Sequence, residues 1–466
     1  MFYKKLFSGL AVGCILLITA FILQLPQSFF LGIVMILVAC LSIVIRIFLD
    51  LGLKGRILMG TCLAALAGSL TVFTFNTINT ARADRLAEKG LIWETHFYKK
   101  SSGDISDITL TPNSDIIFVG NASQYDETNM FYGKLDEDGR LIYKRNLPGF
   151  GSGSFASVVA LSDGGAILAG APYRESSFLL RIDPRGEVIW SKKSGSSKNV
   201  YINQIIPLDN DQFLVAGSDS GQRSDFPNAY ISLLNIDGEI IWENWYGLDL
   251  RTSIHSISIS VGKEIVAVGN YFDTNETNSL RFLKIGMDGE KISDLLPDNK
   301  KSNKLVYSSV TTSESEIDGR TIAGGQTGGY DLRKGQMAVY TVSADFQSVE
   351  VVEYTGPVSG NRGSKIYALR MKTDGNLIVA GHTYQKDNDG KASATIFEIG
   401  PDGTLADSWH MPAYTDTYIY DMIVLPSGAQ IIAGQASADG HYKPTMFIAK
   451  REPKTGRSKA EIITRP

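Results

Sequence analysis

Residues that commonly carry chemistry are few in this sequence, and they do not gather in a familiar pattern. The three cysteines all lie within the first 62 residues, and the rest of the chain contains none. No two histidines have the spacing of metal ligands, and motifs for an activated serine, a phosphate loop or a dinucleotide are absent. We therefore predict no catalytic residues, no bound cofactor and no metal site. The histidines are His96, His255, His382, His410 and His441.

Three weaker patterns leave other chemistry open. His382 and His441 are expected in corresponding loops of adjacent repeats, so a two-histidine surface site competes with ordinary surface histidines. Asp387-Asn-Asp-Gly390 resembles the start of a calcium loop, but the glutamate expected further on is missing, which favours a plain turn. Acidic residues occur at many turns, so the alternative function is an enzyme, a hydrolase or lyase with paired carboxylates at the channel mouth.

Aromatic and basic side chains recur in the longer segments between predicted strands. Such loops on a rigid scaffold often bind partners, and tyrosine and arginine are favoured anchors at interfaces. We predict that these loops form one partner-binding face. The simpler alternative is that the tyrosines cover hydrophobic contacts within their own loops. The residues are Tyr125, Tyr173, Arg174, Arg223, Phe226, Tyr271, Tyr330, Arg333, Tyr384 and Tyr442.

These loops belong to a sequence repeat that starts near residue 90. An apolar run ending in a small residue and glycine occurs seven times, at intervals of 47 to 57 residues. Seven copies at this period, each long enough for four strands, predict an all-β, seven-bladed β-propeller. The glycines that end the run are Gly120, Gly170, Gly217, Gly269, Gly324, Gly381 and Gly434.

The repeat around the third of these glycines shows how four strands are arranged. Residues 201–208 and 212–216 are two strands joined by a short turn, and 229–236 follow after a longer loop. Asp237-Gly238 then turns the chain into the fourth strand at 239–245, because glycine supplies the positive φ that this turn needs.

A large side chain follows the turn glycine by four residues and is expected to wedge between neighbouring blades. It is Tyr143, Trp190 or Trp242 in the first three full copies. Two later copies depart from the pattern. Ser293 takes the aromatic position in the fourth copy, and Ala344-Asp345-Phe346 replaces the glycine turn in the fifth.

Two phrases of the repeat resemble known proteins: Arg181-Ile-Asp-Pro-Arg-Gly-Glu-Val-Ile-Trp190 and Phe213-Leu-Val-Ala-Gly217. They resemble the repeats of quinoprotein-like and related bacterial propellers, in which an Asp-x-x-Gly turn precedes an aliphatic strand with tryptophan. The resemblance spans about residues 90–456 and implies the propeller fold. That superfamily includes dehydrogenases, assembly scaffolds and sensors, and the dehydrogenases' cofactor and calcium residues have no match here. Non-enzymatic envelope scaffolds are therefore the closer analogy.

The ends of the repeat region predict how the ring closes. Gly90-Leu-Ile-Trp93 matches the fourth strand of a blade but precedes the first full copy. The last copy supplies three strands, at 418–425, 429–433 and 446–450. We expect the N-terminal segment to complete the last blade, which would remove a free sheet edge. Residues 460–464 are the rival for the same place.

Three apolar stretches precede the repeats, at 6–25, 29–49 and 57–75. About 20 residues are needed to cross the hydrocarbon core as a helix, so these predict an α-helical segment of three membrane spans. Small residues at Gly9 and Gly13, and again at Gly60 and Gly68, allow close helix packing within the segment or against a membrane partner.

Basic residues predict the orientation of these spans. Lys4 and Lys5 precede the first span, and Arg46, Lys54 and Arg56 flank the second turn. The positive-inside rule then places the N-terminus in the cytoplasm and the propeller on the far side of the membrane, periplasmic or extracellular.

The predicted organisation is three transmembrane helices at 1–80, a linker at 81–89, the propeller at 90–456 and a tail at 457–466. Whether the chain is processed at 81–83, where small residues resemble a cleavage site, is left open. The net charge of -4, with charges of both signs scattered, offers no basic face for nucleic acid. We predict a multi-pass inner-membrane protein whose propeller is a binding or scaffold subunit for another envelope component, a protein or a glycan.

The topology can be tested with a reporter that is active only outside the cytoplasm. Fused after residue 466, the reporter is expected to be active, because the charge pattern places the propeller outside. Fused at Gly52, in the second turn, it is expected to be silent. The reverse pattern would overturn both the topology and the localisation.

Overall fold

The computed structural model describes most of the chain from residue 83 to residue 453. The described ranges are 83–84, 86–87, 89–97, 102–124, 127–147, 152–173, 175–196, 199–209, 211–220, 228–247, 251–272, 278–297, 309–315, 318–327, 335–354, 364–384, 391–411, 416–437 and 445–453. The three predicted spans, with Gly9, Gly13, Gly60 and Gly68, lie outside them. Within these ranges, no helix has the length and apolar character needed to cross a membrane.

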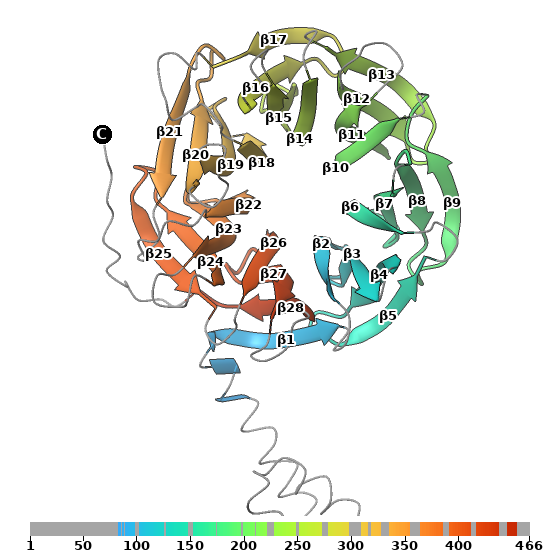
Figure 1. The fold of residues 1–466 in the computed structure, drawn as a ribbon, viewed down its shortest axis with the longest axis vertical. Helices are drawn as coiled ribbons and strands as arrows, with labels where there is room; N and C mark the ends of the chain where they lie inside the picture. The colour runs from blue at the N-terminus through green and yellow to red at the C-terminus, as the bar shows by residue number, and fades with distance from the viewer. Residues whose placement is uncertain are drawn as a thin grey trace, which may run out of the picture. The chain divides into compact units, whose positions relative to one another are not determined.

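The described strands form seven four-stranded antiparallel sheets, arranged as blades around one axis (Figure 1). Blade 1 contains β2 (Ser102–Leu110), β3 (Ile116–Gln124), β4 (Glu127–Leu135) and β5 (Leu141–Asn146). Blade 2 contains β6 (Gly153–Ala160), β7 (Ala166–Pro172), β8 (Phe178–Ile182) and β9 (Val188–Lys193). Blade 3 contains β10 (Val200–Leu208), β11 (Gln212–Asp219), β12 (Asn228–Asn235) and β13 (Ile240–Tyr246).

The remaining blades continue in chain order. Blade 4 contains β14 (Arg251–Ile259), β15 (Ile265–Phe272), β16 (Asn278–Ile285) and β17 (Lys291–Leu295). Blade 5 contains β18 (Ser309–Ser315), β19 (Thr321–Thr327), β20 (Gln336–Val342) and β21 (Val349–Tyr354). Blade 6 contains β22 (Lys365–Met371), β23 (Leu377–Tyr384), β24 (Ala392–Ile399) and β25 (Leu405–His410). Blade 7 contains β26 (Thr417–Val424), β27 (Gln430–Ala436), β28 (Thr445–Arg451) and, from the N-terminal side, β1 (Leu91–Phe97). The predicted seven-bladed β-propeller is confirmed.

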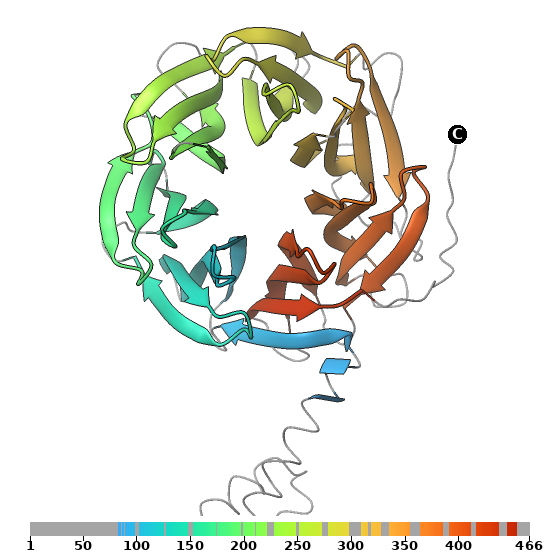
Figure 2. The same cartoon turned by 180° about the vertical axis from the view of Figure 1, so that it is seen from behind.

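The first strand of each full copy lies nearest the axis and the fourth lies on the rim, as both views show (Figures 1 and 2). Because strands alternate in direction, the turns between strands one and two and between strands three and four lie on one face. We call this the short-turn face. The connections between strands two and three lie on the opposite face, which we call the long-loop face.

The repeated apolar run forms the second strand of each blade. Its residues are buried on both sides because each blade is covered by a neighbour on either side, and in β19 every residue is buried. The glycine that ends the run faces a β-bulge in the inner strand. A Cβ at Gly217 would overlap the carbonyl oxygen of Tyr201, and one at Gly434 would overlap that of Tyr418, so the bulge requires glycine there.

In blades 1 to 3 the aromatic residue of the rim strand packs on the turn glycine of the next blade. Tyr143 covers Gly186, Trp190 covers Gly238, and Trp242 covers Gly289. These glycines have φ between 73° and 85°, a range that residues with a Cβ atom rarely adopt. The prediction that these aromatic residues wedge between blades is confirmed.

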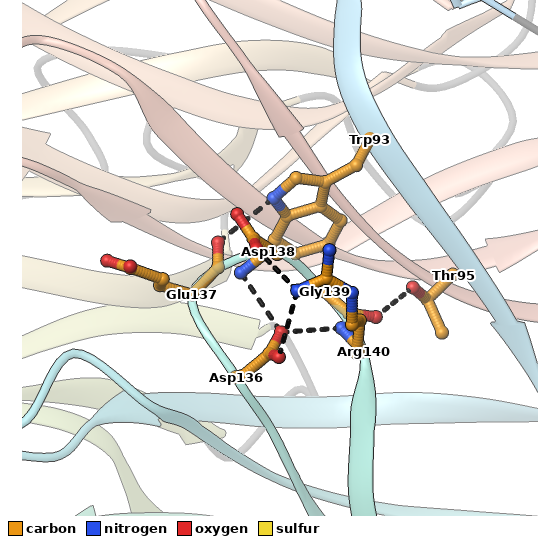
Figure 3. Close-up of polar contacts among 7 residues, drawn as sticks. All are labelled: Trp93, Thr95, Asp136, Glu137, Asp138, Gly139 and Arg140. Carbon is orange, nitrogen blue, oxygen red and sulfur yellow. Dashed lines mark hydrogen bonds and ion pairs between the residues drawn. The ribbon is translucent and has the colours of Figure 1, made fainter.

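Figure 3 shows this contact where β1 meets the turn between β4 and β5. Trp93 Nε1 donates to the carbonyl oxygen of Glu137 at 3.1 Å, and Thr95 Oγ1 donates to that of Gly139 at 2.6 Å. The Asp136 carboxylate stabilises the turn by accepting hydrogen bonds from the backbone N–H groups of Asp138 and Arg140. The contact therefore combines ring packing with hydrogen bonds to the turn backbone.

The two irregular copies compensate for one another. Blade 4 carries Ser293 at the aromatic position, and the turn of blade 5 carries Phe346 in place of glycine, with φ of 59°. The Phe346 ring is buried in a core shared with Phe282 and Val342, and Lys284 lies over it at 5.6 Å. The ring that is missing from the rim strand is thus supplied by the turn itself.

β1 closes the ring by pairing antiparallel with β28, from Leu91 opposite Arg451 to Phe97 opposite Met446. Trp409 of blade 6 donates from Nε1 to the carbonyl oxygen of Lys89 at 2.9 Å, so the residues before β1 take the place of a turn in blade 7. The prediction that the N-terminal segment completes the last blade is confirmed. The rival segment, 460–464, lies outside the described residues.

Trp93 is expected to be a main source of stability at this closure. It is 8% exposed, and removal of a buried tryptophan side chain typically costs about 3–5 kcal/mol. Trp93→Ala should lower the free energy of unfolding by that amount in chemical denaturation. Ile92→Ala is the matched control, because Ile92 is the adjacent residue and 44% exposed, so its change should stay within about 0.5 kcal/mol. Equal effects of the two substitutions would contradict closure through β1.

Candidate functional site

Most of the predicted partner-binding residues lie outside the described residues. The structure describes the side chains of Tyr173 and Tyr271, and the backbone of Tyr384 at the end of β23. The others are Tyr125, Arg174, Arg223, Phe226, Tyr330, Arg333 and Tyr442.

Tyr173 and Tyr271 differ in how they meet the long-loop face. Tyr173 follows β7 directly, and its side chain is 71% exposed. Tyr271 lies within β15, opposite Thr252, and is only 9% exposed, so it supports the strand from within. Its neighbour Phe272 points the other way, because side chains alternate along a strand, and it is 39% exposed. Phe272 is therefore the exposed aromatic of this blade.

Counting from the repeat glycine reveals a pattern that sequence reasoning missed. The third residue after that glycine is aromatic in three alternate blades: Tyr173 in blade 2, Phe272 in blade 4 and Tyr384 in blade 6. The same position holds serine or threonine in the other four blades. Those residues are Ser123, Ser220, Thr327 and Ser437. The sequence analysis selected Tyr271 because it is a tyrosine in this segment. Counting three residues from the repeat glycine selects Phe272 instead.

A second feature lies on the inner strands of four blades, just after the bulge. The side chain there accepts a hydrogen bond from a backbone N–H of the next blade's inner strand. Asp107 accepts from Val158 at 2.7 Å, Ser157 from Ile205 at 3.2 Å, Gln204 from Ile257 at 2.6 Å, and Asp421 from Ile108 at 3.1 Å. These bonds connect blades 7, 1, 2, 3 and 4 in sequence around the axis. We call the four accepting side chains the hydrogen-bonded belt.

Two members of this belt are carboxyl groups that lie next to each other where blade 7 meets blade 1. Arg370 of blade 6 donates from Nη2 to Asp421 Oδ1 at 3.0 Å. Burial, together with the charge and hydrogen bonding of Asp421, raises the pKa of Asp107 well above its usual value. A protonated Asp107 can donate to Asp421 while its other oxygen still accepts from Val158. Both groups therefore take part in the hydrogen bonds that join neighbouring blades.

Aromatic side chains gather on the inner side of blades 6 and 7. Tyr367 and His382 are stacked with centroids 5.6 Å apart, and Tyr418 and Tyr420 are parallel with centroids 6.1 Å apart. The two pairs meet edge to face, at 5.2 Å between the tyrosines and 4.8 Å between His382 and Tyr418. We call these four residues the aromatic cluster. The three tyrosines are each half-buried.

Lys365 lies close to the aromatic cluster, and His255 of blade 4 interacts electrostatically with Lys365. Lys365 Nζ lies 5.1 Å from the centroid of the Tyr367 ring, and burial lowers the pKa of Lys365. Burial, with a smaller contribution from the charge of Lys365, lowers the pKa of His255 to about 4. His255 is therefore neutral at pH 7.

The described residues contain no group of three or more histidine, cysteine, aspartate or glutamate side chains that could hold a metal ion. His382 is buried within the aromatic cluster, 6% exposed, rather than in a surface loop. His441 and Asp387-Asn-Asp-Gly390 lie outside the described residues.

Comparisons with known proteins bear on the fold alone. No protein-family model and no curated protein matches the sequence. Sqt1 from Chaetomium thermophilum, solved with the N-terminus of ribosomal protein L10, is 11% identical, covering 78% of this chain and 100% of its own, with a TM-score of 0.47. A puromycin hydrolase is 14% identical, covering 72% and 50%, with a TM-score of 0.47. A chain of the COPII outer coat vertex on membranes is 8% identical, covering 78% and 89%, with a TM-score of 0.48.

The carboxyl pair gives a prediction about pH. Because the pKa of Asp107 is raised in the folded state, the unfolded chain releases this proton first as pH rises. The resulting stability is present below about pH 4 and is lost as pH rises toward the folded pKa, with a slope of up to about 1.4 kcal/mol per unit. Asp107→Asn keeps an acceptor for Val158 and cannot ionise.

Chemical denaturation between pH 4 and pH 8 should therefore show a flatter pH dependence for Asp107→Asn than for the wild type. Asp237→Asn is the control, because the Asp237 side chain is 69% exposed in a rim turn. It should keep the wild-type slope. If the stability of Asp107→Asn keeps the wild-type dependence on pH, the proton is not held between Asp107 and Asp421.

Proposed function

We propose that this chain is a membrane-anchored, extracytoplasmic binding subunit that holds another envelope component, a protein or a glycan, on its long-loop face. The observation that carries the proposal is the recurrence of aromatic residues at one repeat position of that face. Tyr173 and Phe272 are exposed there, at 71% and 39%. Large exposed aromatic side chains are costly to leave in water and favourable to bury in an interface.

The opposite face is less suited to a partner. Its rim turns already receive the aromatic side chains and hydrogen bonds of the neighbouring blades, as Trp93 and Thr95 show at Gly139. Changes in these turns would disturb the ring itself. Blades also hydrogen-bond to each other at the long-loop end, as Ala229 N–H does to Thr252 Oγ1 at 2.8 Å, but Tyr173 and Phe272 are exposed there and can take part in binding.

The apolar N-terminal stretches and their basic flanks support the membrane part of the proposal. The absence of cysteine after residue 62 is compatible with an envelope location, where stability comes from a large core rather than from disulfides. The spans offer a second contact surface through Gly9, Gly13, Gly60 and Gly68.

Co-purification of tagged full-length protein from solubilised membranes tests the proposal. A variant with Tyr173→Ala, Phe272→Ala and Tyr384→Ala should lose a stoichiometric partner while remaining folded. A central aromatic anchor typically contributes ~2 kcal/mol or more, which corresponds to about a thirtyfold loss of affinity.

The matched control carries Ser123→Ala, Ser220→Ala and Ser437→Ala, the same repeat position in blades 1, 3 and 7. It should recover the partner at the wild-type level. Equal recovery by the aromatic variant would remove the long-loop face from the proposal. Loss only on Gly9→Leu with Gly13→Leu would move the contact to the membrane helices.

A further inference from the structure

The strongest unexplained feature of the described structure is the charge of Lys365. Lys365 is half-buried, and an ammonium group taken partly out of water is normally paired with a carboxylate, because an unpaired charge there is costly. Within the described part of the chain, no ion pair joins Lys365 to a carboxylate, and its Nζ lies 5.1 Å from the centroid of the Tyr367 ring. His255 is the nearby titratable group, and it is neutral at pH 7.

The acidic residues of the inner wall do not compensate this charge. Asp421 is paired with Arg370, and the pKa of Asp107 is raised well above its usual value. Burial raises the pKa of Asp104, which accepts from Asn121 Nδ2 at 2.9 Å. The inner wall of blades 6 and 7 therefore favours an anion.

Lys365 stands out when the blades are compared at the same position. The residue two before the bulge is Asp104, Ser154, Tyr201, Ser253, Ser309, Lys365 or Tyr418 in blades 1 to 7. The fold of the inner strand therefore does not require a lysine here. A purely structural explanation would have to rest on the Tyr367 contact alone.

The aromatic cluster adds ring faces beside this charge. Tyr418 and Tyr420 lie on β26, with Tyr420 at its bulge, and their rings are within 3° of parallel with centroids 6.1 Å apart. Gln435 lies opposite Tyr418 on the adjacent strand and can both donate and accept hydrogen bonds. Aromatic faces for C–H groups, an amide for hydroxyl groups and an ammonium group together fit an acidic sugar.

We propose that Lys365 and the aromatic cluster bind a carboxylate-bearing saccharide at the inner wall of blades 6 and 7. The carboxylate pairs with the Lys365 ammonium group, and the sugar ring packs against Tyr418 and Tyr420. The site shares no residue with the aromatic set of the long-loop face, although its His382 lies two residues before Tyr384, so separate variants distinguish the two sites.

Calorimetric titration of the detergent-solubilised full-length protein tests this site. The probes are disaccharides that contain glucuronate, galacturonate or N-acetylmuramate, and the methyl ester of each as the uncharged counterpart. At least one free acid should bind, and its ester should bind at least tenfold more weakly, since a charge-assisted hydrogen bond is lost. Binding should also protect Lys365 from acetylation by acetic anhydride, measured by mass spectrometry.

Variants locate the binding. Lys365→Met should weaken binding roughly tenfold to a hundredfold, and Lys365→Arg should retain most of it because the charge is kept. Tyr420→Leu should weaken binding, whereas Tyr420→Phe should not. Tyr201→Leu is the matched control, because Tyr201 occupies the Lys365 position in blade 3 and should leave affinity unchanged. Thermal melting confirms that each variant is folded.

Three outcomes would overturn the proposal. No binding by any of the three acidic disaccharides would exclude the class. Equal binding of acid and ester, or unchanged affinity in Lys365→Met, would exclude the lysine as the anion partner. Binding of a tetraglutamate peptide in preference to every saccharide would assign the site to an acidic protein segment instead.

Discussion

The contact between a rim-strand aromatic ring and the turn glycine of the next blade is the interaction on which this propeller depends. The contact joins the outer strand of one blade to a turn of the next blade. It recurs at Gly139, Gly186, Gly238 and Gly289. The turn must have a positive φ and no side chain, and the ring must lie within reach of the turn's carbonyl groups. A single pair of positions therefore determines the spacing between neighbouring blades.

A different chemistry connects the blades near the axis. There single side-chain acceptors on the inner strands reach the backbone of the next blade. The belt tolerates aspartate, serine and glutamine because each presents an oxygen at similar reach. Asp107 and Asp421 meet between blades 1 and 7, and the hydrogen bond between them can be kept only with a shared proton. The contact between these two blades is therefore sensitive to pH.

The repeat was predictable from sequence because each copy repeats the same physical requirement. The apolar run needs burial on both faces, its glycine accommodates the bulge, and the turn glycine receives a ring; each of these leaves a residue type at a fixed spacing. The aromatic cluster could not be predicted in this way. His382 was expected in a surface loop, but β23 extends past it and buries it against Tyr418. Contacts between residues of adjacent blades, such as Asp107 with Asp421, have no local signature because 314 positions separate them in the chain.

The pairing of β1 with β28 has a consequence for how the protein is made. Leu91 and Arg451 are partners, yet nearly the whole repeat region must be synthesised before the second of them exists. Contacts between residues so distant in the chain form slowly, because the entropy of closing the loop is lost before the contact can stabilise it. Until then the first strand has no sheet to join, and the seventh blade has an open edge that could pair with another chain. The interval between the first strand and the last is therefore when the newly made chain is most exposed to aggregation.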